Sequence, residues 1–221
     1  MSTAARWLKP CVALVATALI AQAAHAGPPL ICHPFTTDNA PSLPWTGERT
    51  WRATEASYDA GRLTADTLAL LGPDIPVIAR METLRRATIY AASSPRAANE
   101  LLRTLLTVAE ALARDPQTAA LAEFDAGYLI ESYRQQSEID KTDMLAAFAR
   151  SSGVPLGTLY GYVMVEKAIA MRPQDVAAME FAASLMTTDK AAARRHQSNA
   201  SAGAAPGSAL AANIREVWGN T

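Results

Sequence analysis

Cys32 and His33 are the residues whose types point most directly to chemistry. Cys11 lies in a segment that we expect to be cleaved, which leaves Cys32 as the single thiol of the mature chain. An unpaired thiol in an oxidising compartment is a buried core residue, a redox or metal-binding group, or half of an intermolecular disulfide. A neighbouring imidazole can lower the pKa of the thiol or share a soft metal ion. Adjacent residues of an extended segment point to opposite sides, however, so the sequence favours a structural role for Cys32.

A second set of candidate residues lies on segments with helical spacing. We expect Tyr128, Glu131 and Tyr160 to be the ligand-binding members, because tyrosines at this spacing can line a groove for a peptide or a glycan. The same spacing is also typical of core tyrosines whose hydroxyl reaches the surface. If Glu131 is buried, it needs a cationic partner such as Arg134 or Arg85.

The chain contains none of the short motifs that mark common catalytic and cofactor sites. CxxC, HExxH, CxxCH, Gly-rich phosphate loops and G-x-S-x-G are all absent from the sequence. Asp125 and Glu131 are six residues apart, a separation that does not place two carboxylates on one helical face. We therefore expect no catalytic residue and no cofactor, and a role other than catalysis is favoured.

Residues 1–26 have the features of a secretory signal peptide. Two basic residues precede an apolar run from Cys11 to Ala21, and Ala24 and Ala26 supply the small residues before a cleavage site. The apolar run is too short for a permanent membrane helix. We expect a periplasmic or secreted protein that begins at Gly27 and has no integral membrane segment after cleavage.

The charge of the mature chain argues against nucleic acid as a partner. The full chain has 20 Lys and Arg and 21 Asp and Glu. Removal of residues 1–26 takes away two basic residues and no acidic one, which leaves 18 basic and 21 acidic residues and a net charge of −3. A nearly neutral chain without a basic patch is a poor binder of nucleic acid. The remaining 195 residues suit one domain with its own core.

Apolar residues recur at helical spacing throughout residues 73–188. In Val77–Ala92 they share one side, and Arg80, Glu82 and Arg86 fall on the other. Five further segments follow, separated by capping residues and prolines, and the middle of the third segment is apolar all round. We expect that third segment to be the most buried. Short connections favour antiparallel neighbours, so we predict an all-α fold, an antiparallel helical array or α-solenoid-like bundle. The five further segments are at about 95–114, 116–134, 140–153, 156–171 and 173–187.

The residues Gly161, Val165, Ala168 and Pro173 resemble the second helix and exit turn of a tetratricopeptide-type helical repeat. The resemblance implies close packing at the small residues and a new unit that opens at the proline. The same spacing from Ala to Pro begins at Ala111, 57 residues earlier, whereas such repeats are 34 residues long. A helical bundle without repeats is the alternative.

Two flanking segments complete the organisation. Five prolines between Gly27 and Gly47 oppose a helix, so residues 27–72 are expected to form a Pro-rich extended strap followed by short helices at about 49–58 and 64–71. Residues 190–207 are rich in Ala, Ser, Asn and Gly, so we expect them to be flexible or loosely helical. We expect residues 189–221 as a whole to form a flexible tail with a solvated His196 and a short C-terminal helix. The apolar residues expected to anchor the strap are Leu30, Ile31, Phe35, Leu43 and Trp45.

These features favour an exported binding or scaffold protein of the cell envelope. Amphipathic helices without a catalytic motif can present a groove to a protein or peptide partner, an argument that rests on architecture. One alternative is a thiol-redox or metal-handling protein that uses Cys32 and His33. Another is an enzyme whose site is assembled from residues far apart in the sequence.

Overall fold

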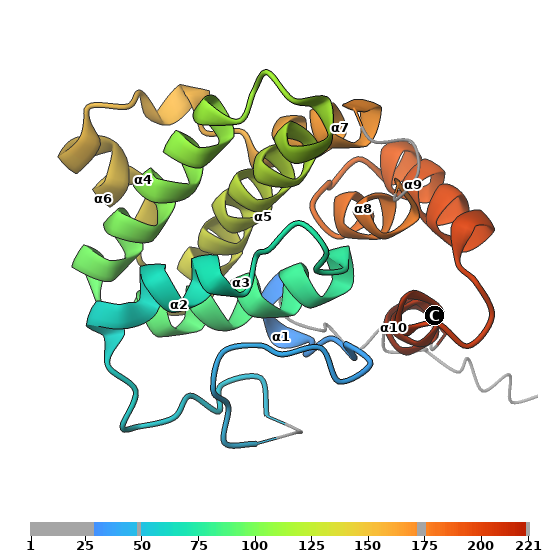
Figure 1. Cartoon of the computed structure of the whole chain (residues 1–221), viewed down its shortest axis with the longest axis horizontal. Helices are drawn as coiled ribbons and strands as arrows, with labels where there is room; N and C mark the ends of the chain where they lie inside the picture. The colour runs from blue at the N-terminus through green and yellow to red at the C-terminus, as the bar shows by residue number, and fades with distance from the viewer. Residues whose placement is uncertain (1–28, 48–49, 172–175, 220–221) are drawn as a thin grey trace, which may run out of the picture.

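A computed structural model of the chain describes residues 29–47, 50–171 and 176–219. Every regular element of these residues is helical, and their sole β pairing is the isolated bridge between Trp45 and Thr54. The predicted all-α fold is therefore confirmed, whereas residues 1–26 lie outside the described residues. None of the helices described is long and apolar enough to cross a membrane. In chain order (Figure 1) the elements are α1 (Pro29–Cys32), the 3₁₀ turn η1 (Ala60–Arg62), α2 (Leu63–Ala69), α3 (Val77–Ala92), α4 (Pro95–Ala111), α5 (Pro116–Asp140), α6 (Met144–Ser152), the 3₁₀ turn η2 (Leu156–Thr158), α7 (Gly161–Met171), α8 (Val176–Ser184), α9 (Lys190–Gly203) and α10 (Ala209–Trp218).

Helix α5 lies in the middle of the fold, in contact with α1, α3, α4, α6 and α7 (Figure 1). Phe124, Tyr128, Leu129 and Tyr133 point to different sides of this helix, and none of them has exposed surface. A helix that is apolar all round is stable when other elements surround it. The apolar middle of this segment is therefore explained by its central place.

Helix α3 is buried along nearly its whole length, including the side on which its charged residues lie. Arg80 is 1% exposed, and Glu82 and Arg85 are fully buried. The charged side faces backbone groups of residues 31–51 and of the α2–α3 loop instead of water. The prediction that the third segment is the most buried is therefore wrong, because α3 is buried over a larger share of its length.

Two helix boundaries differ from the sequence prediction. Asp140 does not begin α6: it is the last residue of α5, and Lys141 then adopts a left-handed backbone with φ 55°. The N-cap of α6 is Asp143, whose side chain accepts a hydrogen bond from the backbone N–H of Ala146. Gly153 ends α6 with φ 76°, as its predicted role as the C-terminal stop requires.

The segment predicted as one helix over 156–171 contains two elements. The turn η2 ends at Thr158, the next residue Leu159 has a φ of −89° and a ψ of 72° that are not helical, and α7 begins at Gly161. Val165 and Ala168, two of the residues that resemble a tetratricopeptide repeat, are buried on α7. Pro173 lies outside the described residues, so the repeat stays a prediction.

The N-terminal segment, residues 29–47, packs against α3 and α5. The apolar anchors Leu30, Ile31, Phe35 and Leu43 are at most 5% exposed. Pro29–Cys32 forms a helical turn instead of the expected extended chain, which is possible because proline fits the first turn of a helix.

Residues 50–58 form turns and the bridge at Thr54, so the helix predicted over 49–58 is wrong for the part that the structure describes. Backbone pairing of Thr46 with Ala53, 2.9 Å from N to O, uses the groups that a helix would need. The helix predicted at about 64–71 is present as α2.

The C-terminal part consists of the helices α9 and α10. Ala192, His196 and Ala200 are spaced four apart on α9 and form its buried side against α8. His196 is 3% exposed, so the prediction of a solvated side chain is wrong. The Asn213 side chain of α10 pairs with Thr36, at 3.0 Å from the Thr36 N and 2.8 Å from its O, and so joins the two ends of the described chain.

Candidate functional site

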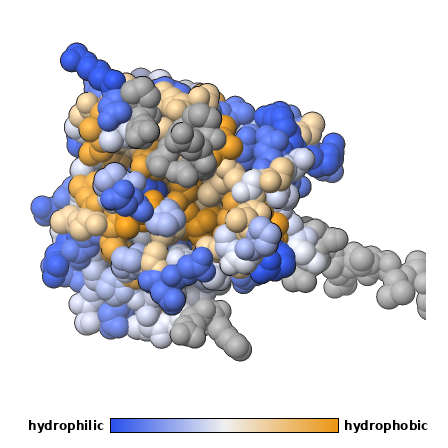
Figure 2. Space-filling view, turned by 45° about the vertical axis from the view of Figure 1, so that its right-hand side comes forward, coloured by the Kyte–Doolittle hydropathy of each residue, from blue (hydrophilic) through white to orange (hydrophobic). Residues whose placement is uncertain are grey.

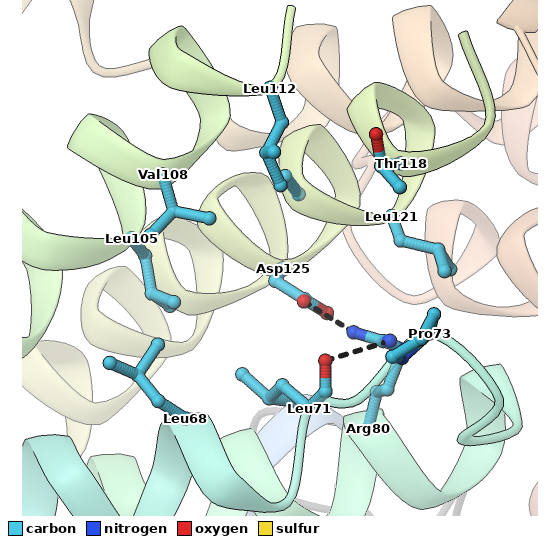
Figure 3. A pocket seen from close by; sticks show the side chains of 11 residues that line it. Leu68, Leu71, Pro73, Arg80, Leu105, Val108, Leu112, Thr118, Leu121 and Asp125 are labelled. Carbon is cyan, nitrogen blue, oxygen red and sulfur yellow. Dashed lines mark hydrogen bonds and ion pairs between the residues drawn. The ribbon is translucent and has the colours of Figure 1, made fainter. Parts of the chain in front are cut away.

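The clearest candidate site is an apolar pocket of about 260 Å³ between α2, α4 and α5, here called the α2–α4–α5 pocket. Figure 2 shows that apolar surface gathers in the middle of the face on which α8 and α9 come forward, with hydrophilic residues around it. Figure 3 shows the pocket from close by, with leucine side chains on several sides and a carboxylate among them. The lining residues are Leu68, Leu71, Pro73, Arg80, Leu105, Val108, Leu112, Thr118, Leu121, Ala122 and Asp125.

Helical periodicity brings these side chains to one place. Leu105, Val108 and Leu112 recur at intervals of three and four along α4, so they share the side that faces α5. Thr118, Leu121, Ala122 and Asp125 recur in the same way along α5. The end of α2 and the loop after it close the pocket with Leu68, Leu71 and Pro73 (Figure 3). The site is therefore built from helix faces that are far apart in the sequence.

A buried ion pair lies at this pocket. Nη1 of Arg80 donates to Oδ2 of Asp125 over 2.5 Å, and the two side chains are 1% and 6% exposed. Within the described residues, Oδ1 of Asp125 has no hydrogen-bond partner, although it is fully buried. Burial raises the pKa of Asp125 to about 7, and the guanidinium of Arg80 opposes this rise. An unsatisfied, buried acceptor thus lies beside the apolar walls of the pocket.

Arg80 is fixed by the loop between α2 and α3. Its Nε donates to the carbonyl of Ile75 over 3.1 Å, and its Nη2 donates to the carbonyls of Leu71, over 3.0 Å, and Gly72. These bonds hold the loop at the pocket and orient the guanidinium toward Asp125 (Figure 3). The sequence did not indicate either residue of the pair as part of a site. One signal was present, since an acid in a segment that is apolar nearly all round needs a buried partner.

The three predicted ligand-binding residues do not share a groove. Tyr128 is fully buried, and its hydroxyl has no hydrogen-bond partner among the residues described. Glu131 is 6% exposed and pairs with Arg134, Oε2 to Nε, over 3.0 Å, one of the two partners expected for it. Tyr160 is 58% exposed. A side chain without exposed surface cannot contact a ligand in an open groove, so Tyr128 belongs to the core.

The predicted redox or metal residues lie in the N-terminal segment. Cys32 and His33 are both partly exposed, and Cys32 is a free thiol. Burial raises the pKa of the Cys32 thiol, while the guanidinium groups of Arg52 and Arg85 lower it to a smaller extent. In the part of the chain that the structure describes, no three His, Cys, Asp or Glu residues are placed to hold a metal ion. A raised pKa makes this thiol less nucleophilic at neutral pH.

We therefore expect Cys32 to react slowly with a disulfide reagent at neutral pH. Because the thiolate is the reacting species, the rate at pH 7.5 should be several-fold lower for the folded chain than for the chain unfolded in guanidinium chloride. As the pH rises above the usual thiol value of about 8.5, the folded rate should continue to increase after the unfolded rate has levelled off. A folded rate equal to or above the unfolded rate at pH 7.5 would contradict this expectation.

A second group of polar side chains joins α9 to α7 and α8. Nδ1 of His196 contacts Oε2 of Glu180, and Nε2 lies 2.8 Å from the hydroxyl of Tyr162. That hydroxyl donates to Oε1 of Glu166 over 3.1 Å, and Asn199 donates to Oε1 of Glu180 over 3.0 Å. These side chains form hydrogen bonds with one another, and the bonds satisfy the polar atoms that α9 buries. We assign this group the role of fixing α9 to the helices beneath it.

The pocket therefore stands as the candidate site on its geometry alone. Comparison of the chain with protein-family models, with curated proteins and with solved structures finds no match.

Proposed function

We propose that this chain is an exported binding protein, periplasmic or secreted, and that the α2–α4–α5 pocket binds its ligand. The signal-peptide features of residues 1–26 support export. Helices without a catalytic motif support a binding role. The observation that carries the proposal is the pocket itself, which combines apolar walls with one unsatisfied, buried acceptor on Asp125. Ligand sites typically have this composition, mostly apolar with a few polar groups that fix the orientation.

The size of the pocket favours a small molecule over a peptide. A volume of about 260 Å³ lies just below the usual range for ligand pockets. A dry, apolar cavity of about 150 Å³ is enough to bind benzene. The pocket therefore suits one apolar group of modest size. A small molecule is the first candidate ligand, and the protein or peptide partner expected from the sequence is the second.

A pocket-filling substitution tests this proposal. A concentration of 1-octanol far above its dissociation constant should raise the unfolding temperature of residues 27–221 by about 5 °C or more, because a ligand that binds only the folded state stabilises it. Val108 lines the pocket and is partly exposed, so Val108→Phe can fill the cavity without deep overpacking. We expect this variant to lose at least about three quarters of the temperature shift. Calorimetric titration should show the same loss.

The matched control is Val163→Phe, the same substitution on α7 at a side chain that is 58% exposed. This variant should retain the full shift. If wild type shows no shift, the pocket is not a binding site for apolar molecules. A shift that survives Val108→Phe would place the binding elsewhere.

A protein partner is favoured by one separate observation. Leu156 belongs to η2, Tyr160 immediately precedes α7 and Val163 belongs to α7, and these side chains are 46%, 58% and 58% exposed. Exposed apolar side chains that lie together mark docking surfaces. An envelope protein that docks here should cross-link to wild type and be lost with Tyr160→Ser together with Val163→Ser. A partner that both proteins capture equally would remove this role from the patch.

The thiol-redox or metal-handling alternative needs a role for Cys32 and His33. It predicts that a partner captured without reductant is lost with Cys32→Ser. Capture of the same partner by wild type and Cys32→Ser would make the thiol structural. The raised pKa of Cys32 gives this alternative no support.

A further inference from the structure

We infer that the ligand of the α2–α4–α5 pocket is a small neutral molecule with an apolar body and one hydroxyl group, which donates a hydrogen bond to Oδ1 of Asp125. This inference rests on the proposed function, since it names the ligand class of the same site. It follows from three properties of the pocket: the type of polar atom that is free, the balance of charge and the volume.

The free polar atom is an acceptor. Oδ2 of Asp125 is taken by Arg80, whereas Oδ1 makes no hydrogen bond to any residue that the structure describes. Asp125 is 4% exposed, and Figure 3 shows its carboxylate among the apolar side chains of the pocket. A buried acceptor without a partner destabilises the structure, and a donor brought by a ligand removes that penalty. The ligand must therefore carry an O–H or N–H group.

Most of the donors at this pocket are already engaged. Arg80 carries five N–H groups. Four hydrogen bonds engage it, one to Asp125 and three to backbone carbonyls of the α2–α3 loop. A ligand that offers an acceptor, such as an ether, an ester or a carboxylate, finds little to pair with here. A carboxylate would also approach the free Oδ1, and two acceptors of like charge repel each other.

The charges of the lining residues cancel. Arg80 and Asp125 are the charged members of the lining, and they pair with each other. An ammonium group would add a buried positive charge without a counter-charge of its own, which is unfavourable in apolar surroundings. A hydroxyl group supplies the donor without the charge. The combination selects neutral alcohols or phenols over amines and acids.

The volume limits the apolar body. If a cavity of about 150 Å³ holds the six carbon atoms of benzene, about 260 Å³ holds roughly ten non-hydrogen atoms. Leu112 at the end of α4 is 39% exposed, so the pocket has an apolar edge at the surface along which such a molecule can enter. A C8 alcohol or a small alkylphenol fits these limits.

The test compares two isomers that differ in the donor alone. 1-Octanol and 1-methoxyheptane have the same atoms, but only the alcohol has an O–H group. Calorimetric titration of residues 27–221 at pH 8.5, where Asp125 is ionised, should give a dissociation constant at least about tenfold lower for the alcohol, the usual worth of a hydrogen bond to a charged group. Octylammonium and octanoate should both bind more weakly than 1-octanol.

A substitution at Asp125 should remove the preference. In Asp125→Asn the amide oxygen can accept from Arg80, which turns the amide N–H₂ into the pocket as a donor. The alcohol-to-ether ratio should then fall below about twofold or reverse. If this variant does not fold, the ratio measured on wild type still decides the inference.

The outcomes separate the two proposals. Equal binding of both isomers to wild type would overturn the hydroxyl inference and leave the apolar pocket in place. Tighter binding of octylammonium or octanoate would also overturn it. If neither isomer binds, the proposed function fails and the inference fails with it.

Discussion

Replacement of Glu82 by Ala should lower the free energy of unfolding by about 4 kcal/mol, the largest loss that we expect from a single side chain. Breaking a buried ion pair by removing one partner typically costs about 3–5 kcal/mol, because the other charge stays buried without compensation. Glu82 and Arg85 both have no exposed side-chain surface. The substitution would therefore leave a fully buried guanidinium without its carboxylate.

The contacts of Glu82 explain why the loss should lie toward the upper end of that range. Its two oxygens accept from Nε and Nη2 of Arg85, over 2.7 and 2.8 Å, in a bidentate pair. Oε1 also accepts from Nε of Arg86 over 2.6 Å, and Oε2 accepts from the backbone N–H of Phe35 over 3.0 Å. The carboxylate of Glu82 thus accepts hydrogen bonds from two arginine side chains and from the backbone of the N-terminal segment.

The two arginines also bind backbone carbonyls of the N-terminal segment and of Trp51 beyond it. Nη1 of Arg85 donates to the carbonyls of Ile31 and Trp51, over 3.1 and 3.0 Å, and Nη1 of Arg86 donates to the carbonyl of Leu43 over 2.6 Å. Loss of Glu82 should therefore also loosen residues 31–51. Faster proteolysis there, at a denaturant concentration where α3 is still folded, would show it.

Urea unfolding followed by circular dichroism measures the effect, with Glu110→Ala as the matched control. Glu110 is an exposed glutamate on α4, and its substitution should change stability by less than about 0.5 kcal/mol. A loss below about 1 kcal/mol for Glu82→Ala would mean that water reaches Arg85 in the variant.

The same residues show how far sequence patterns predict this fold. Helical periodicity predicted the helices, because an apolar side with a period of 3.6 residues depends on local spacing alone. The same rule places Arg80 and Glu82 on the side opposite the apolar one. The rule cannot detect that residues far away in the chain cover that side. The buried charges of α3 thus mark the limit of local patterns.

The candidate site was beyond prediction for the same reason. Its walls come from α2, α4 and α5, and no short motif joins the three. The sequence indicated only that Asp125 and Glu131 do not share a helical face, whereas the structure pairs Asp125 with Arg80, 45 positions earlier. Tyr128 lies one helical turn beyond Asp125 but is enclosed in the core. Spacing along one helix does not specify which neighbour each face meets.

Replacement of Gly161 by Ala should lower the free energy of unfolding by about 2 kcal/mol. A Cβ atom at this position would lie 2.2 Å from the carbonyl oxygen of Gly127 and 2.8 Å from Cγ of Glu131. The first of these atoms belongs to the backbone of α5, so the clash is relieved only if the two helices move apart. Overpacking of this kind typically costs about 1–3 kcal/mol and occasionally more. The lower entropy of the unfolded Ala variant offsets roughly 0.4–1 kcal/mol of that loss.

Gly157→Ala is the control that the chain itself offers. The two glycines are four residues apart, and the sequence suggests the same role for both, the close approach of two helices. At Gly157, however, a Cβ atom would meet no atom within 4 Å among the described residues. We expect this variant to unfold within about 0.5 kcal/mol of wild type. Equal losses for the two variants would contradict the close crossing of α5 and α7.

The α2–α4–α5 pocket should remain intact in Gly161→Ala. The variant should therefore lose stability without losing affinity for a ligand of the pocket. Asp125 and Gly127 are two residues apart on α5, about 200° around the helix axis, so α7 and the pocket lie on opposite sides of it. If α7 moves outward, the hydrogen bond from the backbone N–H of Tyr162 to Oε1 of Glu131, 3.3 Å long, should break first. Under conditions where the variant is folded, its affinity for 1-octanol should stay within about twofold of wild type. A larger change would mean that α5 itself moves, and with it the carboxylate of Asp125.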